Sequence, residues 1–262
     1  MNKSENILLE GRKLIDDAFE SGVKFKTIYY DYNSNLDALK CLESLRNAEV
    51  PTKVVSHLEL QKFSQVVTSS GVIAVAERPH WSEIENSDAY KSTVKIPMTL
   101  VLDRISDPGN AGTIIRTAAA VGAIKVLCIH ECVNMWDSKV VRSGTGAHFK
   151  IPVIEKVDTD SLMERLKDTS IFFTEASKRS ALSGSDPKIY SDVDYFEKAE
   201  SVALFVGSEA HGYTKKVANF LSEHSAQKIV IPMAYNIESL NSAIASSIAS
   251  FEIRRQYELK FK

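Results

Sequence analysis

The stretch that decides the fold of the second half of this chain is KIVIPMAYNIESLNSAIASSIASFEIRRQY, residues 228–257. It starts as an apolar strand at 228–233, passes through a polar bend at 234–238 and opens a long helix at 239. The first turn of a helix leaves backbone N–H groups free, so this arrangement predicts a docking place for a polar ligand. The glycine-rich loops of common nucleotide-binding proteins, GxGxxG and GxxxxGKS, do not occur in the sequence.

Apolar strands separated by helical segments surround this stretch. The predicted strands are TLVLD (99–103), KVLCI (125–129), KIPVI (150–154), SIFFTEA (170–176), VALFVG (202–207) and KIVIPM. A helix is predicted over 111–121, ended by Gly122, and a further helix within 130–153. Such alternation is typical of a mostly parallel sheet covered on both faces. The residues alone therefore predict a doubly wound α/β domain.

The N-terminal part also alternates between helix and strand. We expect helices over 11–21, 36–46 and 58–63, and strands over 27–31, 52–56 and 71–77. This pattern predicts a small α/β domain over residues 1–78. Residues 79–97 lack periodicity and contain two prolines, so we predict a linker there and a second domain over 98–262. Residues 177–199 form a second irregular stretch inside that domain.

Length and composition exclude several classes of protein. A chain of 262 residues with 44% hydrophobic and 25% charged residues is typical of a soluble protein with two modest domains. Its longest apolar runs are too short to span a bilayer, so we expect no membrane segment. Cys41, Cys128 and Cys132 form no disulfide framework, and no suitably spaced histidine accompanies them. We expect buried thiols in a reducing compartment and no metal site.

The balance of charge gives no sign of a basic nucleic-acid-binding domain. The net charge is −2. Residues 1–94 contain 11 basic and 14 acidic side chains, and residues 95–262 contain 21 and 20. Any contact with RNA therefore has to come from a local basic patch.

Two earlier segments combine turn residues with polar side chains. LVLDRISDPGNAGTIIRT, at 100–117, turns at Pro108 and Gly109 and offers Asn110 as the expected helix N-cap. Arg116 lies in the apolar helix that follows, and no carboxylate occupies a position three or four residues away. This absence of a local partner favours a functional arginine over a structural one. The other segment, LFVGSEAHGYT at 204–214, places Glu209 after a strand, where a helix-capping acid is the alternative interpretation.

These two segments and the triplet Ser239-Leu240-Asn241 resemble, in order, the three motifs of the SpoU-type (TrmH-like) RNA 2′-O-ribose methyltransferases. That family belongs to the trefoil-knotted SPOUT class, and the resemblance extends from Met98 to the C-terminus. The segment LLEGRKLIDDAFESG, at 8–22, resembles the substrate-binding domain that often precedes it, which is similar to ribosomal protein L30e and binds RNA. The resemblance implies a knotted methyltransferase domain behind an L30e-like domain, although the alternative of a small domain that only packs or dimerises stays open.

The resemblance also implies roles for individual residues. Asn110, Arg116 and Glu209 are the expected catalytic residues: Arg116 engages the target ribose, and Glu209 orients the arginine by a charge-assisted hydrogen bond. The implied cofactor is S-adenosyl-L-methionine. Its expected binding residues are Thr174, Glu175, Ala176, Gly207, Ile231, Met233, Ser239, Leu240 and Asn241.

RNA binding and assembly follow from the same resemblance. Arg12, Lys13 and Arg142 are the expected RNA contacts, with a solvated helix end or a surface salt bridge as the alternatives. Family members dimerise through the region of the last helix, so we predict a homodimer. Small residues on that helix allow close approach of a partner; they are Ala243, Ala245, Ser246 and Ala249.

The segment HECVNMWDSKVVRSGTGAHFKIPV, at 130–153, is similar to the mitochondrial large-subunit rRNA ribose methyltransferase branch through Asp137, Lys139, Arg142 and GAHF. This implies methylation of a guanosine ribose in large-subunit rRNA in the mitochondrial matrix. Two departures from the branch are the lack of an arginine-rich transit segment and of a long acidic insertion before the second motif. A cytoplasmic location is therefore the alternative.

Three other functions stay open at this point. The first is a tRNA or bacterial-type rRNA methyltransferase. The second is a catalytically idle RNA-binding or ribosome-assembly factor on the same fold. The third is an unrelated nucleotide-binding α/β enzyme, which the absence of a glycine-rich loop disfavours.

Overall fold

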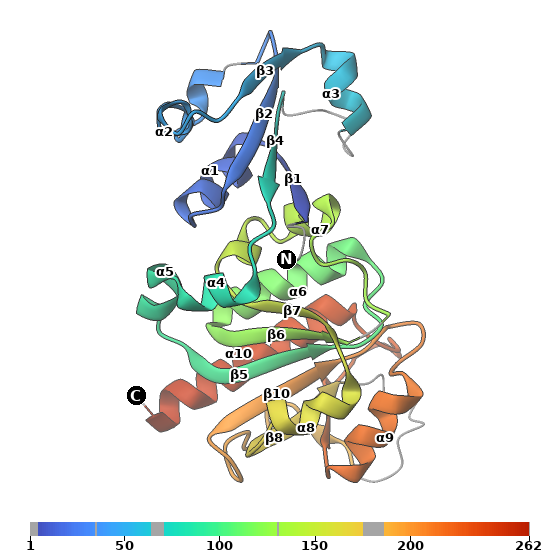
Figure 1. Cartoon of the computed structure of the whole chain (residues 1–262). Coiled ribbons are helices and arrows are strands. Elements are labelled where there is room, and N and C mark those ends of the chain that lie inside the picture. The colour runs from blue at the N-terminus through green and yellow to red at the C-terminus, as the bar shows by residue number, and fades with distance from the viewer. Residues whose placement is uncertain (1–4, 35, 64–70, 130, 175–185, 262) are drawn as a thin grey trace.

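Two α/β units make up the chain in the computed structural model, which describes residues 5–34, 36–63, 71–129, 131–174 and 186–261. The smaller, N-terminal unit lies at one end of the molecule and the larger unit at the other, with a short helical connection between them (Figure 1).

The N-terminal unit is a four-stranded sheet in the order β1-β4-β2-β3. Its elements are β1 (Asn6–Glu10), α1 (Arg12–Glu20), β2 (Phe25–Asp31), η1 (Leu36–Ala38), α2 (Leu42–Asn47), β3 (Thr52–Val55), α3 (His57–Phe63) and β4 (Val72–Glu77). β4 pairs antiparallel with β1 and β2, and β2 pairs parallel with β3. Strand β1 was not predicted, because its sequence NILLE shows neither an alternating pattern nor a run of β-branched residues. β1 forms because it pairs with β4, which lies far along the chain.

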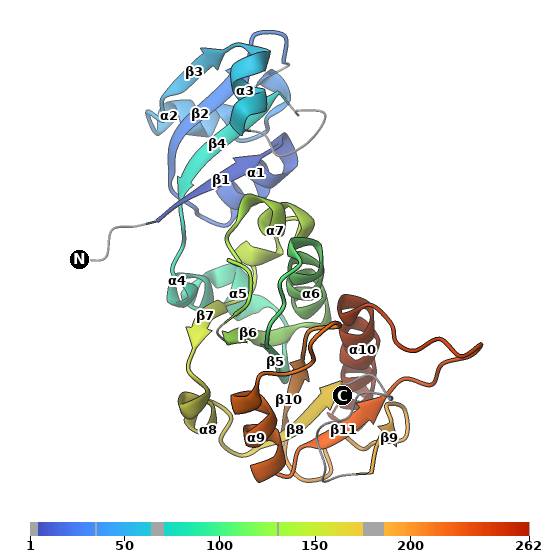
Figure 2. The same ribbon diagram turned by 90° about the vertical axis from the view of Figure 1, so that its right-hand side faces the viewer.

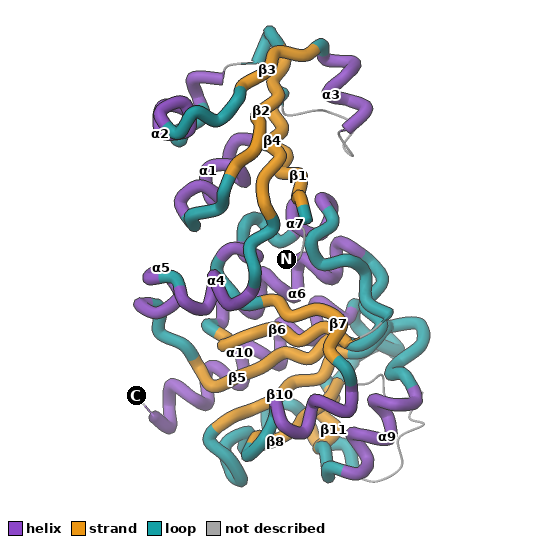
Figure 3. The backbone as a smooth tube through the Cα atoms, viewed as in Figure 1, coloured by secondary structure: helices purple, strands orange, loops and turns teal. Residues whose placement is uncertain are grey.

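The predicted linker contains two short helices, α4 (Trp81–Asn86) and α5 (Asp88–Ser92), drawn in purple in Figure 3. Each has its own N-cap. His80 and Glu83 form a capping box at α4, and the Ser87 side chain accepts a hydrogen bond from the backbone N–H of Tyr90 at α5. The expectation of an irregular segment was wrong here, because helices of five and six residues are too short to show a helical period.

A parallel sheet of seven strands forms the larger unit, in the order β7-β6-β5-β10-β8-β11-β9. All its pairings are parallel. The strands are β5 (Ile96–Leu102), β6 (Ala123–Ile129), β7 (Val153–Val157), β8 (Thr169–Thr174), β9 (Lys188–Ile189), β10 (Ser201–Val206) and β11 (Gln227–Val230). The helical segments are α6 (Pro108–Val121), α7 (Ser138–Ser143), η2 (Ala147–Phe149), η3 (Thr159–Ser161), α8 (Leu162–Arg165), α9 (Lys215–Glu223) and α10 (Ser242–Phe261).

Helices cover both faces of this sheet (Figure 2). Leu100 and Leu102 of β5 belong to the core that includes residues of α6 and α10, whereas Val101 belongs to the core that includes residues of α9. Burial on both faces explains why β5 is a continuous apolar run rather than an alternating one. The predicted doubly wound domain is confirmed in this respect.

The order of the strands places β5 beside β10, although the two are about a hundred residues apart in sequence. From β5 the chain builds outward through β6 and β7, and it then crosses to the other side of β5 to add β8, β10 and β11. The carboxyl ends of β5 and β10 are therefore neighbours at a switch point of the sheet, where open α/β sheets bind their ligands. The trefoil knot stays a prediction.

Candidate active site

Helix α6 begins directly after the turn that follows β5. Asp107 is the N-cap, because its side chain accepts a hydrogen bond of 2.7 Å from the backbone N–H of Asn110, and Pro108 is the first helical residue. The prediction that Asn110 is the N-cap was wrong. Since Asp107 caps the helix, the amide side chain of Asn110 is available for other contacts.

The loop after β10 closes into a tight turn that presents Glu209. The backbone N–H of Ser208 donates to the carbonyl of Gly212 at 3.1 Å, and the N–H of Gly212 donates back at 2.8 Å. Gly212 has a positive φ of 63°, a left-handed conformation that glycine adopts without steric cost. The turn therefore fixes Glu209 at the carboxyl end of β10.

A hydrogen-bonded cluster joins the three sequence motifs. Asn110 Nδ2 donates to Glu209 Oε1 at 3.2 Å, and Asn241 Nδ2 donates to Asn110 Oδ1 at 2.8 Å. Glu209 Oε1 also accepts from the backbone N–H of Ser242, the first residue of α10. Asn241 Oδ1 accepts from the N–H of Ala243 at 3.0 Å, so Asn241 caps this helix. The structure thus brings together Asn110, Glu209 and Asn241, and it starts the last helix three residues later than predicted.

Arg116 lies on the exposed side of α6. It shares a stripe with Gly109, Thr113 and Ala120, which are all exposed. Next to it, Thr117 Oγ1 hydrogen-bonds to Ser247 Oγ of α10 at 2.8 Å. Among the residues that the structure describes, none forms a hydrogen bond or ion pair with the guanidinium of Arg116. The predicted contact between Glu209 and Arg116 is therefore not observed.

Three of the expected cofactor residues lie at the carboxyl ends of adjacent strands. Thr174 ends β8, Gly207 follows β10 and Ile231 follows β11, and these strands neighbour one another in the order β10-β8-β11. Tyr213 joins the first two, because its hydroxyl lies 2.7 Å from the carbonyl oxygen of Thr174 and its ring packs on Gly207. A Cβ added at Gly207 would lie 3.0 Å from that ring, a tight contact that glycine avoids. Sequence reasoning missed Tyr213, although it belongs to the quoted second motif.

The other expected cofactor residues lie in the loop between β11 and α10. Met233 and Leu240 are half-buried and Ser239 is exposed. Figure 2 shows this loop extending away from the carboxyl edge of the sheet. Glu175 and Ala176 lie outside the described residues. The loop offers the apolar side chains of Ile231, Met233 and Leu240 within ten residues of one another, next to a strand end and a helix start.

Asp103 is a buried carboxylate at the end of β5 that sequence reasoning also missed. Its Oδ2 accepts a hydrogen bond of 2.6 Å from the backbone N–H of Thr214, the N-cap of α9. Within the described residues its Oδ1 has no hydrogen-bond partner. Burial raises the pKa of this carboxyl group. The bond to Thr214 fastens the loop that carries Glu209 to the neighbouring strand.

The residues predicted to contact RNA lie near the boundary of the two units. Lys13 Nζ forms an ion pair of 3.0 Å with Asp17 in the next turn of α1, and Arg12 is half-buried. Arg142 of α7 lies 3.5 Å from the carboxylate of Glu10, whose side chain is 5% exposed. For Arg142, the alternative interpretation as a salt bridge describes the structure, and the bridge joins the two units.

Arg78 forms a further polar connection between the units. Its guanidinium hydrogen-bonds to Glu5, at 2.9 Å, and to Glu155 of β7, and it lies over the ring of Trp136 at 5.4 Å. Because these partners come from both units, Arg78 fixes the direction in which the N-terminal sheet leaves the larger one.

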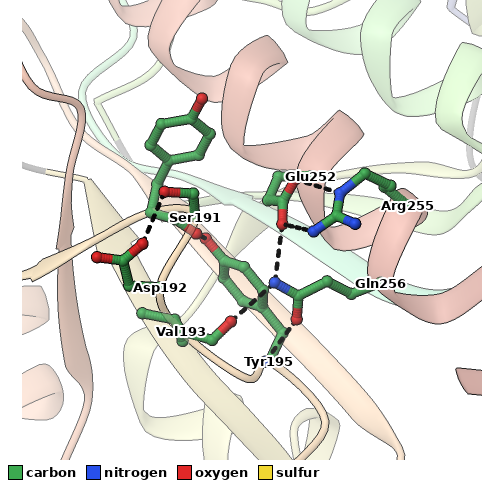
Figure 4. A network of polar contacts seen from close by, with 8 residues as sticks. Ser191, Asp192, Val193, Tyr195, Glu252, Arg255 and Gln256 are labelled. Atoms are coloured by element: carbon green, nitrogen blue, oxygen red, sulfur yellow. Dashed lines mark hydrogen bonds and ion pairs between the residues drawn. The ribbon is translucent and has the colours of Figure 1, made fainter. Parts of the chain in front are cut away.

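The far end of α10 is fixed by a network of side chains (Figure 4). Gln256 Nε2 donates to the carbonyl of Val193 and to Glu252, both at 2.8 Å, and Gln256 Oε1 accepts from the N–H of Tyr195 at 3.2 Å. Arg255 pairs with Glu252 and lowers the pKa of that carboxyl group. The network binds the segment before β10 to the last helix, so that α10 reaches the Asn110–Glu209–Asn241 cluster in a defined position.

His148 is fully buried against Trp136, with ring centroids 5.4 Å apart, and burial lowers its pKa to about 4. In the described ranges, no three histidine, cysteine, aspartate or glutamate side chains lie close enough together to bind a metal ion. None of the helices in those ranges combines the length and the hydropathy needed to cross a membrane.

Comparison with known protein families matches both units. Residues 97–251 match the SpoU rRNA Methylase family, and residues 8–82 match the domain described as RNA 2′-O ribose methyltransferase substrate binding. Among curated proteins, rRNA methyltransferase 3A, mitochondrial, of Danio rerio is 33% identical over 97% of this chain and 65% of its own length. The human rRNA methyltransferase 3, mitochondrial, is 29% identical over 97% of this chain and 68% of its own length. The chain thus spans about two thirds of the length of these relatives.

Solved structures with the same arrangement include two bacterial methyltransferases. The AdoMet-bound rRNA methyltransferase from Sinorhizobium meliloti superposes with a TM-score of 0.73 at 28% identity, covering 95% of this chain and 87% of that one. The SpoU methyltransferase AviRb from Streptomyces viridochromogenes, in complex with AdoMet, superposes with a TM-score of 0.75 at 24% identity, covering 98% and 92%. At 24% identity, the likeness to AviRb shows a shared fold and nothing more.

Proposed function

Because this chain belongs to the SpoU rRNA Methylase family, we propose that it transfers the methyl group of S-adenosyl-L-methionine to a ribose 2′-hydroxyl of rRNA. The matched substrate-binding domain at 8–82 supports RNA as the substrate. Support for the cofactor comes from the AdoMet-bound relative from Sinorhizobium meliloti.

The observation that carries this proposal is the hydrogen-bonded cluster of Asn110, Glu209 and Asn241. Its members come from three segments more than 30 residues apart, and they converge at the switch point of a parallel sheet. Polar side chains that bind one another across such distances form a fixed site. An arginine without a partner among the described residues, Arg116, lies on the helix that carries Asn110.

The cofactor site fits an adenosyl group in its chemistry. Thr174 and Gly207 offer backbone at adjacent strand ends, where glycine permits a close approach. Ile231, Met233 and Leu240 offer apolar surface for an adenine. In our proposal these residues bind S-adenosyl-L-methionine, and Asn241 fixes the first turn of α10 beside it. When bound, the cofactor supplies a methyl group that its sulfonium has already activated.

The residues of the chain align the 2′-hydroxyl with the methyl group, and the proton that the hydroxyl loses passes to water. This alignment lowers the barrier to methyl transfer through proximity and preorganised electrostatics. Arg116 binds the ribose oxygen or the neighbouring phosphate through its planar fork, because an unperturbed guanidinium is a poor base. Asn110, oriented by Glu209 and Asn241, presents a polar amide in the first turn of the same helix.

The finer specificity that we propose is a guanosine ribose in large-subunit rRNA of mitochondria. Support for mitochondrial rRNA comes from the curated relatives, which are named mitochondrial rRNA methyltransferases, and the guanosine and the large subunit follow from the resemblance of residues 130–153. Mapping of 2′-O-methyl positions in tRNA and in mitochondrial and cytoplasmic rRNA after depletion of this protein is the test. We expect one mitochondrial large-subunit guanosine to lose its methyl group. Loss at a tRNA or at a cytoplasmic rRNA position instead would correct the substrate and the location.

Isothermal titration with S-adenosyl-L-methionine tests the cofactor site and separates the proposal from an idle RNA-binding factor. We expect binding by the wild type. In Leu240→Arg we expect loss of binding, because the larger side chain fills the site and brings a charge with no partner into it. Ala234→Ser, at an exposed position of the same loop that is not among the expected cofactor residues, is the matched control and should retain most of the affinity. A wild-type protein that binds RNA but not the cofactor would favour the idle factor.

A further inference from the structure

The loop between β11 and α10 contains an aromatic residue in a conformation that suits glycine. Residues 234–237 form a turn in which the N–H of Ile237 donates to the carbonyl of Ala234 at 3.2 Å. Its two central residues, Tyr235 and Asn236, both have positive φ, 56° and 58°. Asparagine tolerates this left-handed region, whereas a bulky side chain is disfavoured there by the clash of its Cβ with the backbone. Tyr235 therefore costs the fold stability where glycine would not.

Packing does not compensate for this cost. Tyr235 is 97% exposed, the highest value among the large hydrophobic side chains of the described residues. Its neighbour Ile237 is 56% exposed. Neither the backbone conformation nor the packing of the isolated chain explains an aromatic side chain at this position, whereas contact with a bound partner would.

The position of the turn relates it to the candidate active site. The loop starts at the end of β11, with Ile231 and Met233, and ends at Asn241, which belongs to the polar cluster. In Figure 2 the loop projects from the carboxyl edge of the sheet, so its tip is presented to the surroundings. Among residues 231–241 the only charged side chain is Glu238. A partner at this tip therefore meets an aromatic ring rather than a basic patch.

We propose that Tyr235 is a stacking platform for an unpaired base of the substrate RNA, next to the nucleotide whose ribose is methylated. The inference rests on the proposed function for the identity of the partner. Sequence-specific RNA recognition uses single-stranded segments, whose unstacked bases lie on aromatic side chains. Stacking needs no charge from the protein, which suits a loop without lysine or arginine. The platform fixes the base, and the adjacent cluster receives the ribose.

Three variants test the role of the ring. Tyr235→Gly removes the ring and relieves the left-handed strain, Tyr235→Phe retains the ring without the hydroxyl, and Asn236→Gly is the matched control at the neighbouring left-handed residue. Affinity is measured by fluorescence anisotropy with a single-stranded oligoribonucleotide of about 12 nucleotides, and with the same chain made of abasic riboses. Because this measurement needs no methyl transfer, its result does not depend on whether the proposed reaction occurs.

We expect the Kd of Tyr235→Gly for the base-containing RNA to rise about tenfold or more, the effect of losing one stacked base. Its Kd for the abasic chain should stay within about twofold of wild type. Tyr235→Phe and Asn236→Gly should bind both RNAs like wild type. The melting temperature of Tyr235→Gly should be unchanged or higher by about 2–4 °C, since the strain is relieved. Gain or retention of stability together with loss of RNA affinity is a combination that a structural role does not produce.

Unchanged affinity of Tyr235→Gly for the base-containing RNA would overturn the proposal. So would an equal loss of affinity for the abasic chain, because the ring would then contact the backbone rather than a base. Dissociation of a dimer, with a lower melting temperature, would assign Tyr235 to the contact between two copies of this chain. Failure of the wild type to bind S-adenosyl-L-methionine would count against the proposed function and leave the anisotropy result for Tyr235 standing.

Discussion

Arg116 and Glu209 are the residues whose expected and observed surroundings differ most informatively. The family resemblance implied that Glu209 lies beside Asn110 and Arg116 and orients the arginine by a charge-assisted hydrogen bond. In the structure Glu209 contacts Asn110 and the start of α10 but not Arg116. Arg116 remains exposed on α6. At the scale of single residues, this separates two tasks: Glu209 maintains the site, and Arg116 is available to bind substrate.

Replacement of Arg116 tests the second task. We expect Arg116→Ala to retain cofactor affinity and to lose methyl transfer by roughly a hundredfold or more, the scale of one lost transition-state contact. Arg116→Lys should not restore activity, because an ammonium does not reproduce the planar fork of a guanidinium. Measurement of kcat and KM on rRNA, together with titration of the cofactor, tests both expectations. Near-normal kcat in Arg116→Ala would remove this residue from the mechanism.

Replacement of Glu209 tests the first task. Glutamine can still accept hydrogen bonds from Asn110 Nδ2 and from the N–H of Ser242, whereas alanine leaves both donors without this partner. We therefore expect Glu209→Gln to lose about tenfold in kcat and Glu209→Ala about a hundredfold. If the two variants are equally impaired, the charge of Glu209, rather than the geometry it maintains, is what the reaction requires.

At the scale of elements, α6 is positioned by its close contact with α7. A Cβ added at Gly112 would lie 1.7 Å from Ser143 Oγ and 2.4 Å from the carbonyl of Val140, so glycine is required at this crossing. Ser143 Oγ also donates to the carbonyl of Pro108 at 3.0 Å, in the first turn of α6. The turn that carries Asn110 is thus fixed from the side opposite to the cluster. The adjoining η2 segment completes this packing by burying His148.

The burial of His148 predicts how stability depends on pH. Its pKa is lowered from 6.5 to about 4, so between these values the unfolded chain binds a proton that the folded chain does not. The contribution of neutral, buried His148 to the free energy of unfolding is fully present above about pH 6.5. It is lost as the pH falls toward 4, and the total loss is on the order of 3 kcal/mol. Urea denaturation between pH 7.5 and 4.5 measures the slope. His148→Phe should flatten it, and His211→Gln, an exposed control, should not. An unchanged slope in His148→Phe would refute this assignment.

At the scale of the whole molecule, the arrangement of a parallel sheet behind an N-terminal sheet is that of the solved SpoU methyltransferases, so the predicted fold class is confirmed. The homodimer stays a prediction, and the structure changes its expected contacts. Ala243, Ser246 and Ala249 are buried within the chain itself. The outer side of α10 instead exposes Ile244, Phe251 and Leu259, at 51%, 51% and 74%.

We therefore expect a dimer through this outer stripe of α10. Phe251→Asp should yield monomers, because a carboxylate would be desolvated in an apolar contact between two copies. Phe63→Asp is the matched control: Phe63, in α3 of the N-terminal unit, is 65% exposed and should not affect assembly. Sedimentation at micromolar concentration distinguishes these results. A wild-type monomer with full activity would contradict the prediction.

The sequence by itself determined the features that depend on a few neighbouring residues. Gly122 set the end of α6 where it is observed, whereas Pro108 and Gly109, predicted as a turn, are the first two residues of the helix. Continuous apolar runs identified β5, β6, β8, β10 and β11, because parallel strands buried on both faces need such runs. The ordered motifs identified the three segments that meet in the cluster, since each carries its turn and polar residues locally.

Only the tertiary structure decided which of these segments become neighbours. The insertion of β10 between β5 and β8, the pairing of β1 with β4 and the choice of Asn110 rather than Arg116 as the partner of Glu209 are contacts between distant parts of the chain. The same holds for Asp103 and Tyr213, whose partners lie across strand ends. Periodicity and capping act over one or two turns, whereas these contacts are selected by the free energy of packing the whole sheet. That selection leaves no local signal in the sequence.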